Sequence, residues 1–172
     1  MIWPPTRACV AGAAPEKATF TLPLMPAMSW NTSQARWSTP TSAPLGEQRP
    51  GGRSIVCTDS IAYALPEEKE RNVLCTAGRT GRSVIGYFRQ FRPWAFICSD
   101  GGIGKNQSGL SALEAVEPDG IVGCSVSAQT ARMGDGQSTY FDGVISAANS
   151  HARATGVQVG QRAREAAALL LK

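Results

Sequence analysis

The segment 94–106 constrains the fold of this chain more than any other, and it reads Trp-Ala-Phe-Ile-Cys-Ser-Asp-Gly-Gly-Ile-Gly-Lys-Asn. It opens with a short apolar run, 94–98, that has the aromatic and β-branched content of a buried strand. Three glycines then fall within four positions, and a helical pattern begins near Lys105. In α/β proteins a strand, a glycine-rich loop and a helix often bind an anion together, because the first N–H groups of the helix point at the ligand. The segment therefore predicts an α/β fold with a binding site after this strand.

Apolar runs and helical patterns alternate along the rest of residues 53–172. We expect strands at 54–58, 73–77, 94–98 and 121–126, and helices at about 84–91, 106–116, 139–155 and 161–172. The expected buried faces are Val84, Phe88 and Phe91 in the first helix, and Ala163, Ala166, Ala167 and Leu170 in the last. Strands that alternate with helices through short loops predict a three-layer α/β domain, with a mainly parallel sheet and helices on both faces.

Residues 1–52 differ in composition from everything that follows. They contain eight of the eleven prolines, scattered so that neither a helix nor a central strand can form, and three of the four tryptophans. We interpret 1–52 as an irregular or disordered proline-rich extension and 53–172 as the α/β domain. Two explanations of the extension stay open: it packs irregularly on the domain, or it was never selected for folding, as with an upstream start or a misread frame.

Charge and cysteine content limit the classes of partner and compartment. The formal net charge is +4, but residues 1–53 hold five basic and two acidic residues, so the domain itself is nearly neutral and no nucleic-acid partner is expected. The five cysteines show no C-x-x-C spacing and no disulfide framework, which favours small buried thiols in a reducing cytoplasm over a zinc site. The N-terminus has no signal-peptide pattern and no segment is long enough to span a bilayer, so we expect a cytoplasmic protein without a membrane partner.

The loops that follow the expected strands form the candidate site. Parallel strands place their carboxyl ends at one edge of the sheet, where ligands bind in such folds. The candidate ligand-binding residues there are Asp59, Ser60, Arg79, Arg82, Gly101, Gly102, Gly104, Ser127, Arg132 and Gly134, and the candidate catalytic residues are Asp100, Lys105 and Asp135. The alternative is an ordinary surface, since loops are polar and glycine-rich even without a site.

Known nucleotide motifs do not fit this region. A P-loop would need glycine where Ser99 stands and serine or threonine where Asn106 stands. The four residues 101–104 do not match G-x-G-x-x-G, and no G-x-S-x-G occurs in the chain. We therefore expect no nucleotide or dinucleotide cofactor and no α/β-hydrolase nucleophile.

A resident metal is not predicted either. His151 is the sole histidine, which excludes a multi-histidine site, and its place in an expected helix favours a packing or surface role. Asp59, Asp100 and Asp135 have the chemistry to hold Mg²⁺ together, but aspartates in such loops more often cap a turn or a neighbouring N–H group.

Several of these motifs resemble those of a bacterial family of small α/β proteins, over about residues 54–171. The matching elements are Asp59-Ser60, Asp100-Gly-Gly-x-Gly-Lys105, Arg132-x-Gly-Asp-Gly-x-Ser138 with Gly143-Val-Ile-Ser-x-x-Asn149, and Gly156-Val-x-Val-Gly160 through Glu165-Ala166. That family has no established function, so the resemblance implies only the fold. The layout is also similar to the C-terminal, effector-binding domain of pyruvate kinase. The chain differs from the family in its first fifty residues and in Arg79-Thr-Gly-Arg82 of the second loop.

Two main functions fit the candidate site, and we keep both. The first is an enzyme acting on a small anionic metabolite, as an isomerase, lyase or hydrolase, with Asp100 or Asp135 as general base and Lys105 as its electrostatic or acid partner. The alternative is a non-catalytic binding or regulatory subunit, in which the arginines matter and the aspartates do not. A structural or assembly protein without a ligand is a third hypothesis.

The C-terminus suggests self-association. Leu169, Leu170 and Leu171 point in three directions around one helical turn, and one domain face can bury about two of them. Exposed apolar surface at this end predicts a homodimer. The alternatives are that the extension 1–52 covers the leucines or that the end frays.

Overall fold

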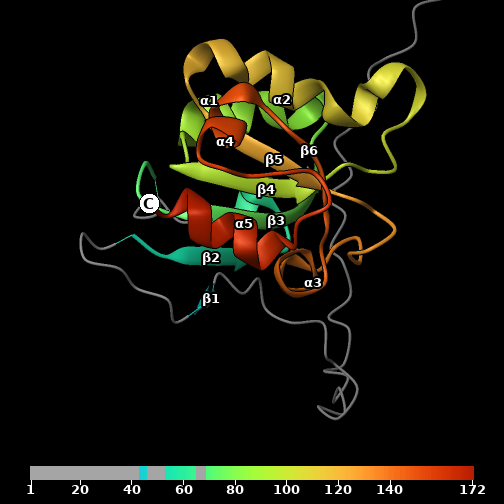
Figure 1. Ribbon diagram of the computed structural model, residues 1–172. Coiled ribbons are helices and arrows are strands. Elements are labelled where there is room, and N and C mark those ends of the chain that lie inside the picture. The colour runs from blue at the N-terminus through green and yellow to red at the C-terminus, as the bar shows by residue number, and fades with distance from the viewer. Residues whose placement is uncertain (1–42, 46–52, 65–68) are drawn as a thin grey trace, which may run out of the picture. The chain divides into compact units, whose positions relative to one another are not determined.

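The computed structural model describes residues 43–45, 53–64 and 69–172, all within one compact unit of the chain, Trp37–Lys172 (Figure 1). One sheet has the strand order β1-β2-β3-β4-β5-β6. The strands are β1 (Ala43–Leu45), β2 (Ile55–Thr58), β3 (Val73–Arg79), β4 (Ala95–Ser99), β5 (Val122–Val126) and β6 (Ile145–Ala148). Strands β2 to β5 pair in parallel, and β1 and β6 add antiparallel edges. The expected α/β class with a mainly parallel sheet is confirmed.

The strand at one edge lies in a part of the chain that we expected outside the sheet. Residues 43–45 belong to the extension 1–52, yet Ala43 to Leu45 pair antiparallel with β2. The other residues of the extension lie outside the described residues, so its boundary at residue 53 stays a prediction. Among the described helices, none is long and apolar enough to cross a bilayer.

Among the described residues, five α-helices accompany the sheet: α1 (Ile85–Phe91), α2 (Ser111–Val116), α3 (Gly136–Phe141), α4 (Ser150–Ala154) and α5 (Ala163–Leu170). Successive side chains of a strand point to opposite faces, and the buried ones divide into two clusters accordingly. One cluster combines Cys75 and Ile97 with buried residues of α3, α4 and α5. The other combines Leu74 and Phe96 with buried residues of α1 and α2. In Figure 1, α1 and α2 lie on one side of β4 and α5 lies on the other.

The first expected helix has the buried face that its sequence pattern predicts. Phe88 of α1 is fully buried and stacks on Phe96 of β4, with ring centroids 3.9 Å apart and an interplanar angle of 17°. Val84 and Phe91 pack half-buried against the same cluster. Burying an aromatic side chain of this size contributes about 1.5–3 kcal/mol, so this pair is a main source of stability on its face.

The last helix is also as expected. Ala163, Ala166, Ala167 and Leu170 are the buried residues of α5. Leu171 is buried as well, while Leu169 packs half-buried against the same cluster. The apolar surface on which the homodimer expectation rested is therefore reduced to part of Leu169, and the homodimer stays a prediction.

The helix expected at 139–155 is wrong. In its place the chain forms α3, then the antiparallel strand β6, then α4. The Asp135 carboxylate accepts a hydrogen bond from the Ser138 N–H at 2.8 Å, so the helix begins before Thr139. Residues 145–148 pair with the open edge of β5, and this tertiary pairing outweighs the local helical pattern.

Candidate functional site

The loops that follow β3 and β4 are joined at the carboxyl edge of the sheet. Thr80, directly after β3, donates its N–H to the Ser99 carbonyl at 2.8 Å and accepts the Ala112 N–H at 3.0 Å. Its buried hydroxyl also donates to the Ser99 carbonyl, at 2.9 Å, and lies 2.7 Å from the Ser125 hydroxyl. Thr80 therefore holds the start of one loop against β4, β5 and the helix that follows β4.

A cavity of about 290 Å³ lies between these two loops. Its described lining residues are Arg79, Gly81 and Ser83 from the first loop and Gly101, Ile103, Gly104, Ser108 and Gly109 from the second. We call it the loop pocket. It brings together three of the predicted site residues: Arg79, Gly101 and Gly104.

Arg79 supplies the charge of the loop pocket. It is the last residue of β3 and is exposed, and a Cβ atom at Gly101 would lie 3.0 Å from its Cδ. The absence of a side chain at position 101 therefore leaves room for the aliphatic part of the arginine. Within the described part of the chain Arg79 takes part in no ion pair, so its positive charge is open to a ligand.

The loop that follows β4, residues 100–110, has a strained backbone; we call it the β4 loop. Besides its glycines, Ile103, Asn106 and Gln107 have φ of 66°, 55° and 56°. Such left-handed conformations cost about 1–2 kcal/mol for a residue with a side chain, and a β-branched residue rarely adopts them. Ile103 lines the loop pocket and is 40% exposed. Strain of this kind is typical of functional loops, where the surrounding structure holds it in place.

The β4 loop corrects one expectation about the site. A 3₁₀ helix covers Lys105–Leu110, interrupted by non-helical φ and ψ at Asn106 and Gln107, and the α-helix expected to begin near Lys105 begins only at Ser111. The loop is instead closed by a hydrogen bond of 2.7 Å from the Gly109 N–H to the Ile103 carbonyl. The first N–H groups of α2, which the strand–loop–helix pattern placed beside Gly104, therefore lie further along the chain.

Asp100, a candidate catalytic residue, is buried, with 2% of its surface exposed. Its Oδ1 atom accepts two backbone hydrogen bonds, from Gly102 at 2.7 Å and from Ala128 at 3.0 Å. The carboxylate therefore fastens the β4 loop to the start of the loop that follows β5. Lys105 is exposed, and no hydrogen bond or ion pair between described residues joins it to Asp100.

A second group of predicted site residues surrounds the start of α3. The Asp59 carboxylate accepts the Gly136 N–H at 3.1 Å, and Asp135 caps the helix through Ser138. The Arg132 Nη1 atom lies 3.9 Å from the Asp135 Oδ2 atom, so the two form a long ion pair, and 81% of the Arg132 side chain is exposed. None of these residues is among the described lining of the loop pocket.

The aspartates of this second group accept backbone N–H groups, as expected of aspartates in such loops, but the docking of α3 on β2 that they support was not predicted from the sequence. α3 approaches β2 so closely that a Cβ atom at Gly136 would lie 2.2 Å from the Thr58 carbonyl oxygen. Asp59, directly after β2, then reaches the N–H of the same glycine. The two contacts dock the start of α3 against the end of β2, and they explain why an aspartate follows that strand.

The remaining predicted site residues also lie outside the described lining of the loop pocket. The Ser60 hydroxyl accepts the Ala62 N–H at 3.3 Å, and the Ser127 hydroxyl accepts the Gln129 N–H at 3.2 Å. Arg82 and Gly102 are exposed, and Gly134 has φ of 79° in the loop that follows β5. Sequence reasoning did not single out Gly81, Ser83, Ile103, Ser108 and Gly109, which also line the loop pocket. The glycine at position 109, inside an expected helix, was the available signal.

No metal centre emerges from the described residues, which contain no group of three His, Cys, Asp or Glu side chains placed to hold an ion. Asp59, Asp100 and Asp135 each accept backbone N–H groups, the role that competed with Mg²⁺ binding. His151 lies in α4, and its Nε2–H donates a hydrogen bond to the Glu117 carbonyl at 3.0 Å. The Ser150 hydroxyl and N–H, and then the charge on His151, lower the pKa of Glu117.

The four described cysteines, Cys57, Cys75, Cys98 and Cys124, are free and buried, as expected of small apolar residues. Burial raises the pKa of Cys124 to about 12 and that of Cys98 well above its usual value. A hydrogen bond with Cys57 and then burial raise the pKa of Cys75. These three thiols stay protonated at neutral pH, so none is an activated nucleophile.

Comparisons with known proteins identify no family or function for this chain. No family model matches the chain, no curated protein matches it, and no solved structure matches it. The resemblance to the bacterial family and the likeness to the pyruvate kinase domain therefore stay predictions, and the function must be argued from the site.

Proposed function

We propose that this protein binds a small anionic metabolite, bearing a carboxylate or a phosphate, in the loop pocket. The observation that carries the proposal is Arg79, which forms no ion pair with any described residue, beside two glycine-containing loops around one cavity of about 290 Å³. This volume lies at the small end of ligand sites, which suits a compact metabolite better than a nucleotide.

The chemistry of the lining favours an anion. Arginine offers a planar set of N–H donors that matches carboxylate and phosphate oxygens. The Ser83 and Ser108 hydroxyls can donate as well, and the glycines allow a ligand to approach the backbone. Among the described lining residues none is acidic, so nothing in the lining opposes a negative charge.

The same lining favours binding over catalysis. It includes no Asp, Glu, His, Cys or Lys among the described residues, so no general base or acid faces the cavity. Asp100 is occupied by two backbone N–H groups. We therefore propose a binding or regulatory role first.

An enzyme acting on the same anion is the second candidate. It is favoured by the chain positions of Asp100 and Lys105, which directly flank segment 101–104, and three residues of that segment, Gly101, Ile103 and Gly104, line the pocket. In that case a rearrangement of the β4 loop would have to free the Asp100 carboxylate for proton transfer.

The deciding experiment is a thermal-shift screen of the full chain against inorganic phosphate, pyruvate and 3-phosphoglycerate. A ligand that raises the melting temperature should lose its effect in Arg79→Ala and keep it in Arg164→Ala, an exposed arginine of α5. Hits are then tested for consumption, which separates the enzyme from the binding protein. A shift that survives Arg79→Ala unchanged contradicts the assignment of the site.

We also infer a cytoplasmic location and a homodimer, the latter through surface that includes Leu169. Free buried thiols are typical of a reducing compartment, and they support the first inference. Light scattering on the full chain tests the second, and a monomer at high concentration contradicts it.

A further inference from the structure

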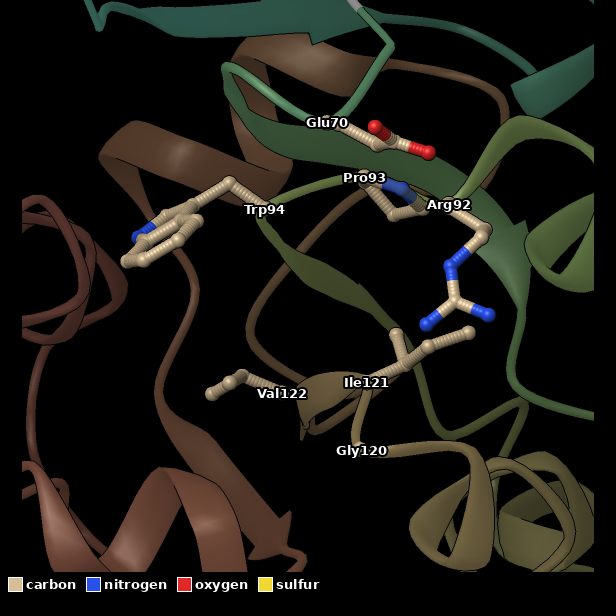
Figure 2. A pocket seen from close by; sticks show the side chains of 7 residues that line it. All are labelled: Glu70, Arg92, Pro93, Trp94, Gly120, Ile121 and Val122. Atoms are coloured by element: carbon tan, nitrogen blue, oxygen red, sulfur yellow. The ribbon is translucent and has the colours of Figure 1, made fainter.

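A larger cavity, of about 530 Å³, lies at the amino ends of β4 and β5, the opposite edge of the sheet from the loop pocket (Figure 2). We call it the edge pocket. Pro93 and Trp94 directly precede β4, Ile121 precedes β5, and Val122 opens β5, so the sheet itself positions these lining residues. Nothing in the anion-binding role of the loop pocket accounts for this second cavity.

One part of the edge pocket is apolar and held in place. Pro93 and Ile121 are buried and Val122 is half-buried. Trp94 exposes 38% of its surface, although its indole N–H donates to the Leu170 carbonyl at 2.8 Å. The Arg53 guanidinium lies 3.5 Å from the centre of the indole ring. The indole is therefore fixed from two directions while part of it stays open to a ligand.

The edge pocket also carries one charge of each sign. Glu70 and Arg92 both line it, and Figure 2 shows the Arg92 guanidinium across the pocket from the Trp94 ring. The Glu70 N–H donates to the Arg92 carbonyl at 2.8 Å, which holds the two residues together through their backbones. Among the described residues, however, the two side chains form no ion pair with each other. Arg92 does donate to the Asp119 carbonyl at 3.1 Å, which uses part of its donor set.

Backbone strain marks the same two residues. Glu70 and Arg92 have φ of 59° and 47°, and the other described non-glycine residues with positive φ all lie in the β4 loop. Arg92 also precedes a proline, which further restricts its backbone. Arg92 is the left-handed C-cap of α1, which accounts for its φ, so Glu70 is the residue of the pair whose positive φ has no such helix-end cause.

We propose that the edge pocket binds a free amino acid with an apolar side chain. The Arg92 guanidinium takes the α-carboxylate, the Glu70 carboxylate takes the α-ammonium group, and the apolar side chain lies against Trp94 and Ile121. A ligand with both charges satisfies two groups that do not satisfy each other. A ligand that carries only one charge leaves either the Glu70 carboxylate or the Arg92 guanidinium without an opposite charge.

Isothermal titration of the full chain with L-phenylalanine and L-leucine tests the proposal. Phenylpropionate lacks the ammonium group of phenylalanine, and phenethylamine lacks the carboxylate. We expect each analogue to bind about tenfold or more weakly than L-phenylalanine, since a lost charge-assisted hydrogen bond is worth at least one decade of affinity. Equal affinity for the three compounds, or no binding of either amino acid at millimolar concentration, overturns the proposal.

Two variants locate the site. Glu70→Gln should weaken L-phenylalanine about tenfold and leave phenylpropionate as tightly bound as before, because only the ammonium partner changes. Arg92→Gln should do the reverse, weakening L-phenylalanine and sparing phenethylamine. Glu114→Gln, an exposed carboxylate of α2 outside the lining, is the matched control. Arg79→Ala must leave phenylalanine binding unchanged. If Arg79→Ala instead abolished phenylalanine binding, the amino acid would lie in the loop pocket and the assignment to the edge pocket would be overturned.

Discussion

Two neighbouring loops at the carboxyl edge of the sheet share a composition but differ in backbone conformation and in the residues that fasten them. The β4 loop and the loop that follows β5, residues 127–135, which we call the β5 loop, both begin after a buried parallel strand and both contain aspartate and glycine. The β4 loop holds Ile103, Asn106 and Gln107 at positive φ, whereas in the β5 loop only a glycine, Gly134, has positive φ.

Their hydrogen bonds differ in the same way. The β5 loop is fastened by distant side chains: Asp100 accepts the N–H of Ala128, and Asp59 accepts the N–H of Gly136 just beyond the loop. The β4 loop, joined to the β5 loop by the same Asp100 carboxylate, is also closed on itself by the bond from Gly109 to Ile103, and it leaves a cavity beside Arg79. The comparison teaches that one loop composition can build either the wall of a cavity or an anchor for a helix.

The largest expected effect comes from disrupting the docking of α3 against β2. Gly136→Ala places a Cβ atom 2.2 Å from the Thr58 carbonyl oxygen, so α3 must move away from β2. We expect the free energy of unfolding, measured by urea denaturation, to fall by about 3 kcal/mol. Gly86→Ala is the control: nothing lies within 4 Å of its added Cβ in α1, and it should raise stability by about 1 kcal/mol. Wild-type stability in Gly136→Ala would mean that α3 is not docked in this way.

The second prediction concerns the carboxylate that joins the two loops. Asp100→Ala leaves the Gly102 and Ala128 N–H groups without their acceptor, and should lower the free energy of unfolding by about 2 kcal/mol. Asp100→Asn keeps an acceptor oxygen at that place and should lose roughly half as much. If both variants are as stable as the wild type, Asp100 does not fasten the loops. An Asp100→Asn protein that binds a metabolite but no longer converts it would support the enzyme instead.

The third prediction tests the difference in backbone strain. Ile103→Gly removes a β-branched side chain from φ of 66° and should stabilise the protein by about 1 kcal/mol. Gly134→Ala adds a side chain at φ of 79°, where nothing lies within 4 Å of the new Cβ, and should destabilise by about the same amount. Thermal or urea denaturation measures both. If both substitutions changed the free energy of unfolding in the same direction, the contrast between a strained β4 loop and a relaxed β5 loop would not hold.

The smallest effect on stability is expected at Arg79, the residue on which the proposed anion site depends. Arg79 is exposed and unpaired among the described residues, so Arg79→Ala should change the free energy of unfolding by less than about 0.5 kcal/mol. The same variant should abolish the thermal shift caused by an anion of the loop pocket. A large loss of stability would show that Arg79 supports the β4 loop rather than a ligand.

The sequence by itself determined the parts of the structure that depend on near neighbours in the chain. The apolar runs of β2 to β5 and the small buried face of α5, from Ala163 to Leu170, follow from periods of two and of about 3.6 residues. The loops of the candidate site were identified for the same reason, because glycine and aspartate mark the ends of strands locally. Arg79 and Gly101 were assigned to one edge once the strands were taken as parallel.

Tertiary structure decided which partner each polar group found. Residues 145–148 form β6 because the edge of β5 offers them hydrogen bonds, although their local pattern favours a helix. Asp100 fastens a loop because the Ala128 N–H, 28 positions away, lies within 3.0 Å of its carboxylate. A buried N–H or C=O group must be paired, and the available partners exist only after the chain has brought distant segments together. That is why the positions of the candidate residues could be read from the sequence while the division between the loop pocket and the anchor of α3 could not.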